Sequence, residues 1–267
     1  MKIALVQFHT VASIQENLNH MQEILSSLQA DFIVLPELWI CPYENQKIEE
    51  AKVYAEKARS LLQIAAKKNK SWIIGGTLPY DNQNLCFVFD RQGKQIATYA
   101  KAHLLEVHAT HTYKESDVFT PGNSLCCFDT EWGKMGVLIC YDIRFPEMSR
   151  ILAQSGIQIL FLPAAFNKKV GEAHWKPLLQ TRAMENEIFI VAVNPDYSYQ
   201  AYQAYGHSLI ANPFGKVLYE IQKEEVLTCD IDLEEIQKIR NRMPLWKLRR
   251  TDLYEIKEKE YERNQHS

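Results

Sequence analysis

The chain has 267 residues, of which 46% are hydrophobic and 24% charged, a balance typical of a globular enzyme rather than a disordered chain. Its formal net charge of −3 leaves no basic surface for nucleic acid, and no apolar run is long enough to span a membrane. The N-terminus does not resemble a signal peptide and the six cysteines include no Cys-x-x-Cys pair, so we expect a cytoplasmic protein with reduced thiols and with no membrane or nucleic-acid partner.

Strand-like and helix-like segments alternate through the first hundred residues. Short apolar runs predict strands, and apolar positions that recur every three or four residues predict helices. The expected order is a strand at 2–8, a helix at 14–28, a strand at 31–35, a long helix at 47–70, a strand at 72–77 and a hairpin of strands 84–90 and 94–99. Residues 101–121 have no clear period, and long irregular stretches of this kind are often functional.

Regular structure resumes after this irregular stretch. The expected order is strands at 125–129 and 135–139, a helix at 146–154, a strand at 157–162, a helix at 172–186, a strand at 188–193, hairpins through 207–211, 217–221 and 225–231, and a helix at 232–242. No repeat or change of composition divides the chain, so we expect one domain over residues 1–267 with a charged tail from about residue 255. The alternation predicts an α/β protein with sheets inside and helices outside, but periodicity alone does not establish an αββα order.

Three apolar runs each end at one chemically useful residue: Glu37, Lys101 and Cys140. Each residue alone has an ordinary explanation, as a solvated carboxylate, a surface lysine or an inert buried cysteine. Together they are what a thiol nucleophile needs, because a base must take its proton and a cation must stabilise the thiolate and the oxyanion. Sites in α/β sheets gather at the carboxyl ends of strands, so we expect these residues to meet. We also expect a poised thiolate at Cys140 that reacts selectively with iodoacetamide.

Three motifs surround these residues. They are Leu-Pro-Glu-Leu at 35–38, Lys-Ala-His-Leu at 101–104 and Cys-Tyr-Asp-Ile-Arg-Phe-Pro-Glu at 140–147. In this order they resemble the motifs of the nitrilase (carbon–nitrogen hydrolase) superfamily. The resemblance implies a four-layer αββα sandwich and a triad in which Glu37 is the general base, Lys101 stabilises the tetrahedral intermediate and Cys140 is the nucleophile. It also implies that Glu115 orients the lysine and the substrate, and that the Tyr141 backbone N–H completes the oxyanion hole.

The residues that flank these motifs resemble the Nit-type amidases. Cys41-Pro42-Tyr43 and Ala165-Phe166-Asn167 favour the ω-amidases among them. The resemblance then implies hydrolysis of the terminal amide of a small carboxylate-bearing substrate, such as α-ketoglutaramate, through a cysteine thioester. An amidase for deaminated glutathione or another aliphatic amidase is the alternative within the superfamily. A non-catalytic protein that binds amides or partner proteins is the alternative from another class.

Arg144 is the candidate for binding the carboxylate of such a substrate, because a guanidinium offers two parallel hydrogen bonds to a carboxylate. It could instead form a structural ion pair with Glu147 or another acid. Tyr43, Phe166 and His174 are further candidates for contact with the substrate, and each could instead be a packing residue.

Three histidines, His103, His108 and His111, lie together in the irregular stretch. Their spacing matches no recognised metal site, so we expect ordinary loop histidines, with His103 structuring the site, and neither a metal nor a cofactor. The family resemblance also implies a homodimer that involves the C-terminal region, including Leu245 and Trp246. A tryptophan beside arginine and leucine suits an interface, although a core role is equally open.

Overall fold

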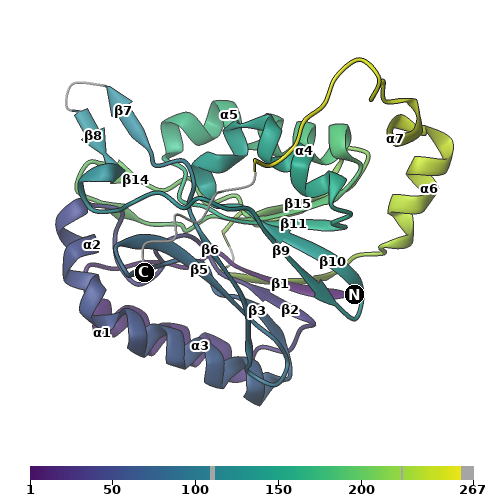
Figure 1. Ribbon diagram of the computed structural model, residues 1–267. Helices are drawn as coiled ribbons and strands as arrows, with labels where there is room; N and C mark the ends of the chain where they lie inside the picture. The colour runs from purple at the N-terminus through teal and green to yellow at the C-terminus, as the bar shows by residue number, and fades with distance from the viewer. Residues whose placement is uncertain (109–111, 224, 260–267) are drawn as a thin grey trace, which may run out of the picture.

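Two β-sheets lie face to face between two layers of helices, so the order through the molecule is helix, sheet, sheet, helix (Figure 1). The computed structural model describes residues 1–108, 112–223 and 225–259. The expected four-layer αββα sandwich is therefore confirmed. In this described part of the chain, no helix combines the length and the apolar character needed to cross a membrane.

The first sheet has seven strands in the spatial order β17-β1-β2-β3-β5-β4, with β6 paired to β5. They are β1 (Lys2–Val6), β2 (Phe32–Val34), β3 (Trp72–Ile74), β4 (Leu78–Tyr80), β5 (Gln83–Phe89), β6 (Gln95–Ala100) and β17 (Val226–Asp230). Strands β1, β2 and β3 run parallel and share one carboxyl edge. Glu37 lies just beyond that edge, a few residues after β2 ends.

The second sheet has six strands in the order β16-β15-β12-β11-β10-β9. They are β9 (Cys126–Thr130), β10 (Gly133–Val137), β11 (Ile159–Pro163), β12 (Phe189–Val193), β15 (Leu209–Ala211) and β16 (Val217–Glu220). Strands β10, β11 and β12 are parallel, and β11 and β12 are buried along their whole length. Their continuous apolar sequences fit strands that are covered on both faces.

Helices cover the outer face of each sheet (Figure 1). Over the first sheet lie α1 (Ile14–Ser27), α2 (Asn45–Ala51) and α3 (Ala55–Asn69), over the second lie α4 (Pro146–Gln154) and α5 (Lys168–Asn186), and α6 (Glu234–Arg242) and α7 (Leu245–Leu248) lie at one end. Helix α1 begins at an N-cap, where the Ser13 side chain accepts a hydrogen bond from the Glu16 N–H, and it buries Leu18, Met21 and Leu25. Each such side chain contributes about 1.5–3 kcal/mol through burial.

The helix expected over residues 47–70 is divided in the structure. A 3₁₀ turn at Lys52–Tyr54 separates α2 from α3. The buried positions Ile48, Ala51, Ala55 and Ala58 keep a spacing of three or four residues across this turn. A 3₁₀ turn therefore leaves the apolar pattern intact, and for this reason periodicity did not reveal it.

The last hairpin expected from the sequence is also wrong in its pairing. Strand β17 pairs antiparallel with β1 in the first sheet, and not with β16 in the second. Alternation of apolar residues reports that a segment is a strand, but it carries no information about which distant strand will accept its hydrogen bonds. The chain thus returns to its N-terminal strand after completing the second sheet.

The stretch at 101–121 is more regular than expected. It contains a small hairpin of β7 (Glu106–His108) and β8 (Thr112–Lys114), followed by a 3₁₀ turn at Glu115–Asp117. A second small hairpin, of β13 (Ser198–Tyr199) and β14 (Tyr202–Gln203), was not predicted. Of the expected charged tail, residues 255–259 are described and have no regular structure, whereas residues 260–267 lie outside the described part.

Candidate active site

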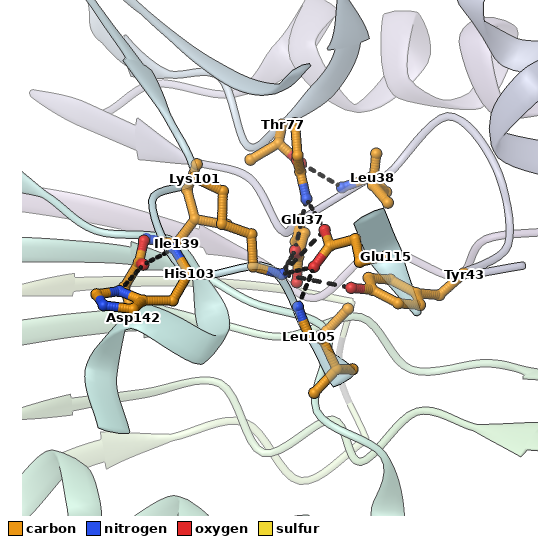
Figure 2. Close-up of polar contacts among 12 residues, drawn as sticks. Glu37, Leu38, Tyr43, Thr77, Lys101, His103, Leu105, Glu115, Ile139 and Asp142 are labelled. Atoms are coloured by element: carbon orange, nitrogen blue, oxygen red, sulfur yellow. Dashed lines mark hydrogen bonds and ion pairs between the residues drawn. The ribbon is translucent and has the colours of Figure 1, made fainter. Parts of the chain in front are cut away.

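Glu37 lies in a turn between the two sheets, and hydrogen bonds fix the backbone of that turn. Its backbone N–H donates to the Ala164 carbonyl (3.2 Å), which follows β11 in the second sheet. The next residue, Leu38, has a φ of +47°, and its N–H donates to Thr77 Oγ1 (2.8 Å) (Figure 2). Gly76 crosses beside this turn with a φ of +62°, where any Cβ would overlap the turn's backbone. Neighbours from both sheets therefore fix the backbone at Glu37.

Lys101 is the centre of a buried hydrogen-bond network. Its Nζ donates to Glu37 Oε1 (2.7 Å), to both carboxylate oxygens of Glu115 (2.8 and 3.1 Å) and to the Tyr43 hydroxyl (3.3 Å) (Figure 2). Both ion pairs have no exposed side-chain surface. Burial opposes the charge of Lys101, but Glu115 and Glu37 outweigh it and hold its pKa well above the ordinary value. The lysine is therefore a permanent cation.

Asn84, on β5, is a member of this network that the sequence analysis missed. Its Nδ2 donates to Glu37 Oε1 (2.8 Å) and to Glu115 Oε1 (2.9 Å), so it links the two carboxylates. The backbone carbonyl of Asn84 also accepts a hydrogen bond from the backbone N–H of Lys101 (3.0 Å). Asn84 is buried although it lies at the polar start of β5, directly before the apolar run 85–89, and asparagine is uncommon in strands; that was the only signal available in the sequence.

The Glu37 carboxylate keeps one oxygen unused. Oε2 is buried and has no hydrogen-bond partner among the described residues, while Oε1 accepts from both Lys101 and Asn84. Burial raises the pKa of Glu37; Lys101 lowers it, and the Glu115 charge adds to the increase. The Cys140 thiol is its other neighbour. A carboxylate with a raised pKa and one unpartnered oxygen beside a thiol is suited to accept a proton.

Cys140 opens the 3₁₀ turn Cys140–Arg144, just after β10. Its φ of +45° lies in the left-handed region, which costs a non-glycine residue free energy. The thiol is also a neighbour of the Ala165 backbone amide. Tyr141 is the second residue of the turn, and N–H groups at the start of a helix have no acceptor within it. This conformation therefore places the Cys140 sulfur beside backbone N–H donors.

The thiol itself differs from the expected poised thiolate. Burial raises the pKa of Cys140 well above its ordinary value, and the Glu37 charge raises it further, while Lys101 opposes both. The lysine opposes this increase only in part, because it is already paired with two carboxylates. The expectation of a preformed thiolate was wrong, and the thiol needs a base at the moment of attack.

Asp142 fixes the turn that carries the cysteine, and it too was missed. Its Oδ2 accepts from the Ile139 N–H (3.1 Å) and from the Tyr99 hydroxyl (2.8 Å). Its Oδ1 lies 2.9 Å from both the backbone nitrogen and Nδ1 of His103 (Figure 2). Because His103 follows Lys101 by two residues, Asp142 ties the cysteine turn to the lysine segment. His103 therefore has the structuring position that was expected.

Arg144 lies in a second cluster at the end of the cysteine turn. Its Nη1 lies 3.2 Å from Nδ1 of His174, and its guanidinium lies 5.1 Å from the centre of the Phe166 ring and 5.7 Å from that of Tyr141. In residues 1–108, 112–223 and 225–259, no carboxylate is within ion-pair distance of Arg144, so the expected alternative of a pair with Glu147 is wrong. The structure brings Tyr43 to Lys101 instead, apart from this cluster.

The loop histidines do not gather around a common point. His103 pairs with Asp142 and His108 pairs with Glu106 (3.2 Å), while His111 lies outside the described residues. Over the described ranges, no group of three His, Cys, Asp or Glu side chains has the arrangement of a metal site.

Comparisons with known proteins show which family the chain resembles. The family model for carbon–nitrogen hydrolases matches residues 2–241. The chain is 37% identical to omega-amidase NIT2-A of Xenopus laevis, over 97% of this chain and 98% of that protein. It is 37% identical to omega-amidase NIT2 of Homo sapiens, over 86% and 87%. The crystal structure of Nit3 from Saccharomyces cerevisiae, a nitrilase-superfamily member, is similar with a TM-score of 0.84 at 30% identity, over 94% of this chain and 96% of that one.

Proposed function

The chain belongs to the carbon–nitrogen hydrolase family and is an amidase, and we propose that Cys140, Glu37 and Lys101 perform its reaction. One observation carries the assignment of the residues. The buried Glu37 carboxylate is a neighbour of the buried Cys140 thiol, it keeps one oxygen without a partner, and its other oxygen is held by a lysine that stays charged. A non-catalytic binding protein would have no use for a buried base next to a buried thiol.

The first half of the reaction forms a thioester. Glu37 Oε2 accepts the thiol proton as the Cys140 sulfur attacks the amide carbonyl, and the oxyanion forms against Lys101 and the Tyr141 N–H. Protonated Glu37 then gives that proton to the departing nitrogen, so the carbon–nitrogen bond breaks and ammonia leaves. Each proton transfer of this kind is typically worth ~10²–10⁴-fold in rate.

The second half regenerates the free thiol. Glu37 takes a proton from water, the resulting hydroxide attacks the thioester, and the carbon–sulfur bond breaks. The Glu37 proton returns to the sulfur, and a carboxylic acid leaves. The same oxyanion donors serve both halves, because both pass through a tetrahedral intermediate at the same carbon.

The donors on Lys101 limit how the substrate enters. An ammonium has three N–H groups, and in the free protein they are directed at Glu37, Glu115 and Tyr43. The contact with the Tyr43 hydroxyl is the longest, at 3.3 Å, and it is the only one of the three to a neutral group. We therefore expect the substrate oxygen to take the position of the Tyr43 hydroxyl on Lys101.

The proposed substrate is a short amide that also carries a carboxylate, such as α-ketoglutaramate. Arg144 supports this choice, because its guanidinium has no carboxylate partner in the described structure and lies on the same turn as Cys140. Phe166 packs against the Arg144 guanidinium and is 4% exposed, so one side of the guanidinium faces an apolar ring. The names of the similar proteins, omega-amidases, support the same substrate class.

Two experiments test this function. Replacing Cys140 with Ala should remove ammonia release and the acyl adduct seen by intact-protein mass during turnover, whereas Cys127→Ala, at an exposed thiol, should leave both unchanged. Normal turnover by the first variant would reject the nucleophile. The second experiment compares ammonia release from α-ketoglutaramate, deaminated glutathione and simple aliphatic amides. A higher kcat/KM for deaminated glutathione would favour the alternative within the family.

We further propose that the protein is a cytoplasmic homodimer. Its six cysteines are free, as expected in a reducing compartment. Near the C-terminus Leu248 and Leu253 are 69% and 73% exposed, and the Arg150 and Arg249 guanidiniums lie over the Trp246 ring. Light scattering on the purified protein tests the dimer, since a single mass near 31.0 kDa would reject it.

A further inference from the structure

The Tyr113 hydroxyl is buried and has no hydrogen-bond partner in the described part of the chain. Tyr113 lies on β8, two residues before Glu115. Burying a hydroxyl without a partner is unfavourable, and a phenylalanine at this position would avoid that cost. An unpartnered buried donor beside an active site therefore points to a ligand that supplies the missing acceptor.

The surroundings of this hydroxyl are the groups of the active site. The Tyr113 ring lies 5.8 Å from the Tyr43 ring at an angle of 45°. Burial raises the pKa of Tyr113, the Glu115 charge raises it further and Lys101 lowers it, so its hydroxyl lies within the field of both. Tyr43 also acts on it, although the two hydroxyls do not meet hydrogen-bond geometry in the free protein.

Tyr43 connects Tyr113 to the catalytic lysine. The Tyr43 oxygen accepts from Lys101 Nζ (3.3 Å), which leaves the Tyr43 proton to donate elsewhere. The Tyr113 ring packs against the Tyr43 ring, so both tyrosines lie near the lysine. The Tyr113 hydroxyl is thus an additional donor on the Lys101 side of the site.

The amide oxygen of the substrate is not the natural acceptor for this donor. In the proposed reaction that oxygen is held by Lys101 and the Tyr141 N–H, and it replaces the Tyr43 hydroxyl on the lysine. Tyr113 lies beyond Tyr43 as seen from Lys101 Nζ, so its hydroxyl is available to donate to another acceptor atom. The proposed substrates have such an atom, because they carry an oxo group or a carboxylate beyond the amide.

We propose that Tyr113 is a substrate-binding residue whose hydroxyl donates to a second oxygen of the acyl group, the oxo or carboxylate oxygen, and so favours acid amides over simple aliphatic amides. This inference rests on the proposed function.

The test compares Tyr113→Phe with the wild-type protein on three four-carbon amides: 2-oxosuccinamate, succinamate and butyramide. The variant should lower kcat/KM for 2-oxosuccinamate by about tenfold, the loss expected when a buried hydrogen bond to a substrate oxygen is removed. For butyramide, which has no second oxygen, kcat/KM should change by less than about twofold. Either result for succinamate supports the proposal: a loss identifies the carboxylate as the acceptor, and no loss identifies the oxo group.

Tyr219→Phe is the matched control, because it removes a tyrosine hydroxyl that donates to the Asp230 carbonyl (3.0 Å) away from the site. It should leave all three values unchanged. An unchanged kcat/KM of Tyr113→Phe for 2-oxosuccinamate, or an equal loss for butyramide, would overturn the role of Tyr113 while leaving the proposed function intact. A wild-type protein that hydrolyses butyramide and neither acid amide would instead reject the proposed substrate, and this inference with it.

Discussion

Replacement of Asn84 by Leu tests whether the buried network sets the basicity of Glu37. The leucine has nearly the same shape, but it removes the amide hydrogen bonds to Glu37 (2.8 Å) and to Glu115 (2.9 Å). Because those bonds stabilise the ionised carboxylates, their loss raises the pKa of Glu37, which burial has already raised. Glu37 must be ionised to accept the thiol proton, so activity appears as pH rises through this pKa, and the variant should need a higher pH.

The size of the shift follows from the number of bonds lost at each carboxylate. A hydrogen bond to a charged group contributes about 1.5–3 kcal/mol, and one pKa unit corresponds to 1.36 kcal/mol. One bond lost at Glu37 therefore moves the acid limb of kcat/KM upward by about 1–2 pH units. The apparent pKa belongs to the coupled cluster of Glu37, Glu115, Lys101 and Cys140 rather than to one residue.

The assay is ammonia release from the best amide over a range of pH, with kcat/KM fitted at each value. Asn69→Leu is a matched control, because Asn69 is a buried asparagine that donates to the Leu25 carbonyl (2.6 Å), in contact with neither carboxylate. It should lower the thermal midpoint without moving the acid limb. The reasoning fails if Asn84→Leu folds and its acid limb coincides with that of the wild type.

Three further predictions concern the substrate, the thiol and the fold. Arg144→Lys should raise KM for a dicarboxylic monoamide by about tenfold more than for a neutral amide, because lysine cannot offer the two parallel hydrogen bonds of the guanidinium. Steady-state kinetics with both amides check this. An equal effect on both would remove the role assigned to Arg144. Glu37→Gln removes both the base and the charge that raises the Cys140 pKa. The loss of the base should dominate, so iodoacetamide labelling of the active-site thiol should slow by about 10²-fold relative to the exposed Cys127, an internal standard in the same mass spectrum. Equal slowing at both thiols, or none, would contradict the need for a base. Gly76→Ala should lower stability by about 2–5 kcal/mol and the thermal midpoint by about 5–15 °C, because it combines a positive φ with overlap against the turn. Gly156→Ala, whose Cβ would meet nothing within 4 Å, should show the cost of the positive φ alone, and a drop as large as that of Gly76→Ala would exclude the overlap.

Much of the fold and the main reacting groups were readable from the sequence, because they depend on local pattern. Short apolar runs such as residues 159–163 are typical of buried strands, and a polar residue soon after such a run lies near the carboxyl edge of the sheet. In this way Glu37, Lys101 and Cys140 could be selected as strand-end residues. The motif resemblance then supplied the αββα order and Glu115, which periodicity could not.

The tertiary structure decided what depends on distant partners. Strand β17 pairs with β1 at the edge of the first sheet. The two strands are far apart in the sequence, so this pairing could not be predicted from local pattern. Asn84 and Asp142 join the site only because hydrogen bonds bring β5 to Glu37 and the cysteine turn to His103. The upward shift of the Cys140 pKa likewise depends on burial and on the Glu37 charge, which Lys101 opposes. Hydrogen-bond partners and desolvation are properties of the folded environment, and no spacing along one chain encodes them directly.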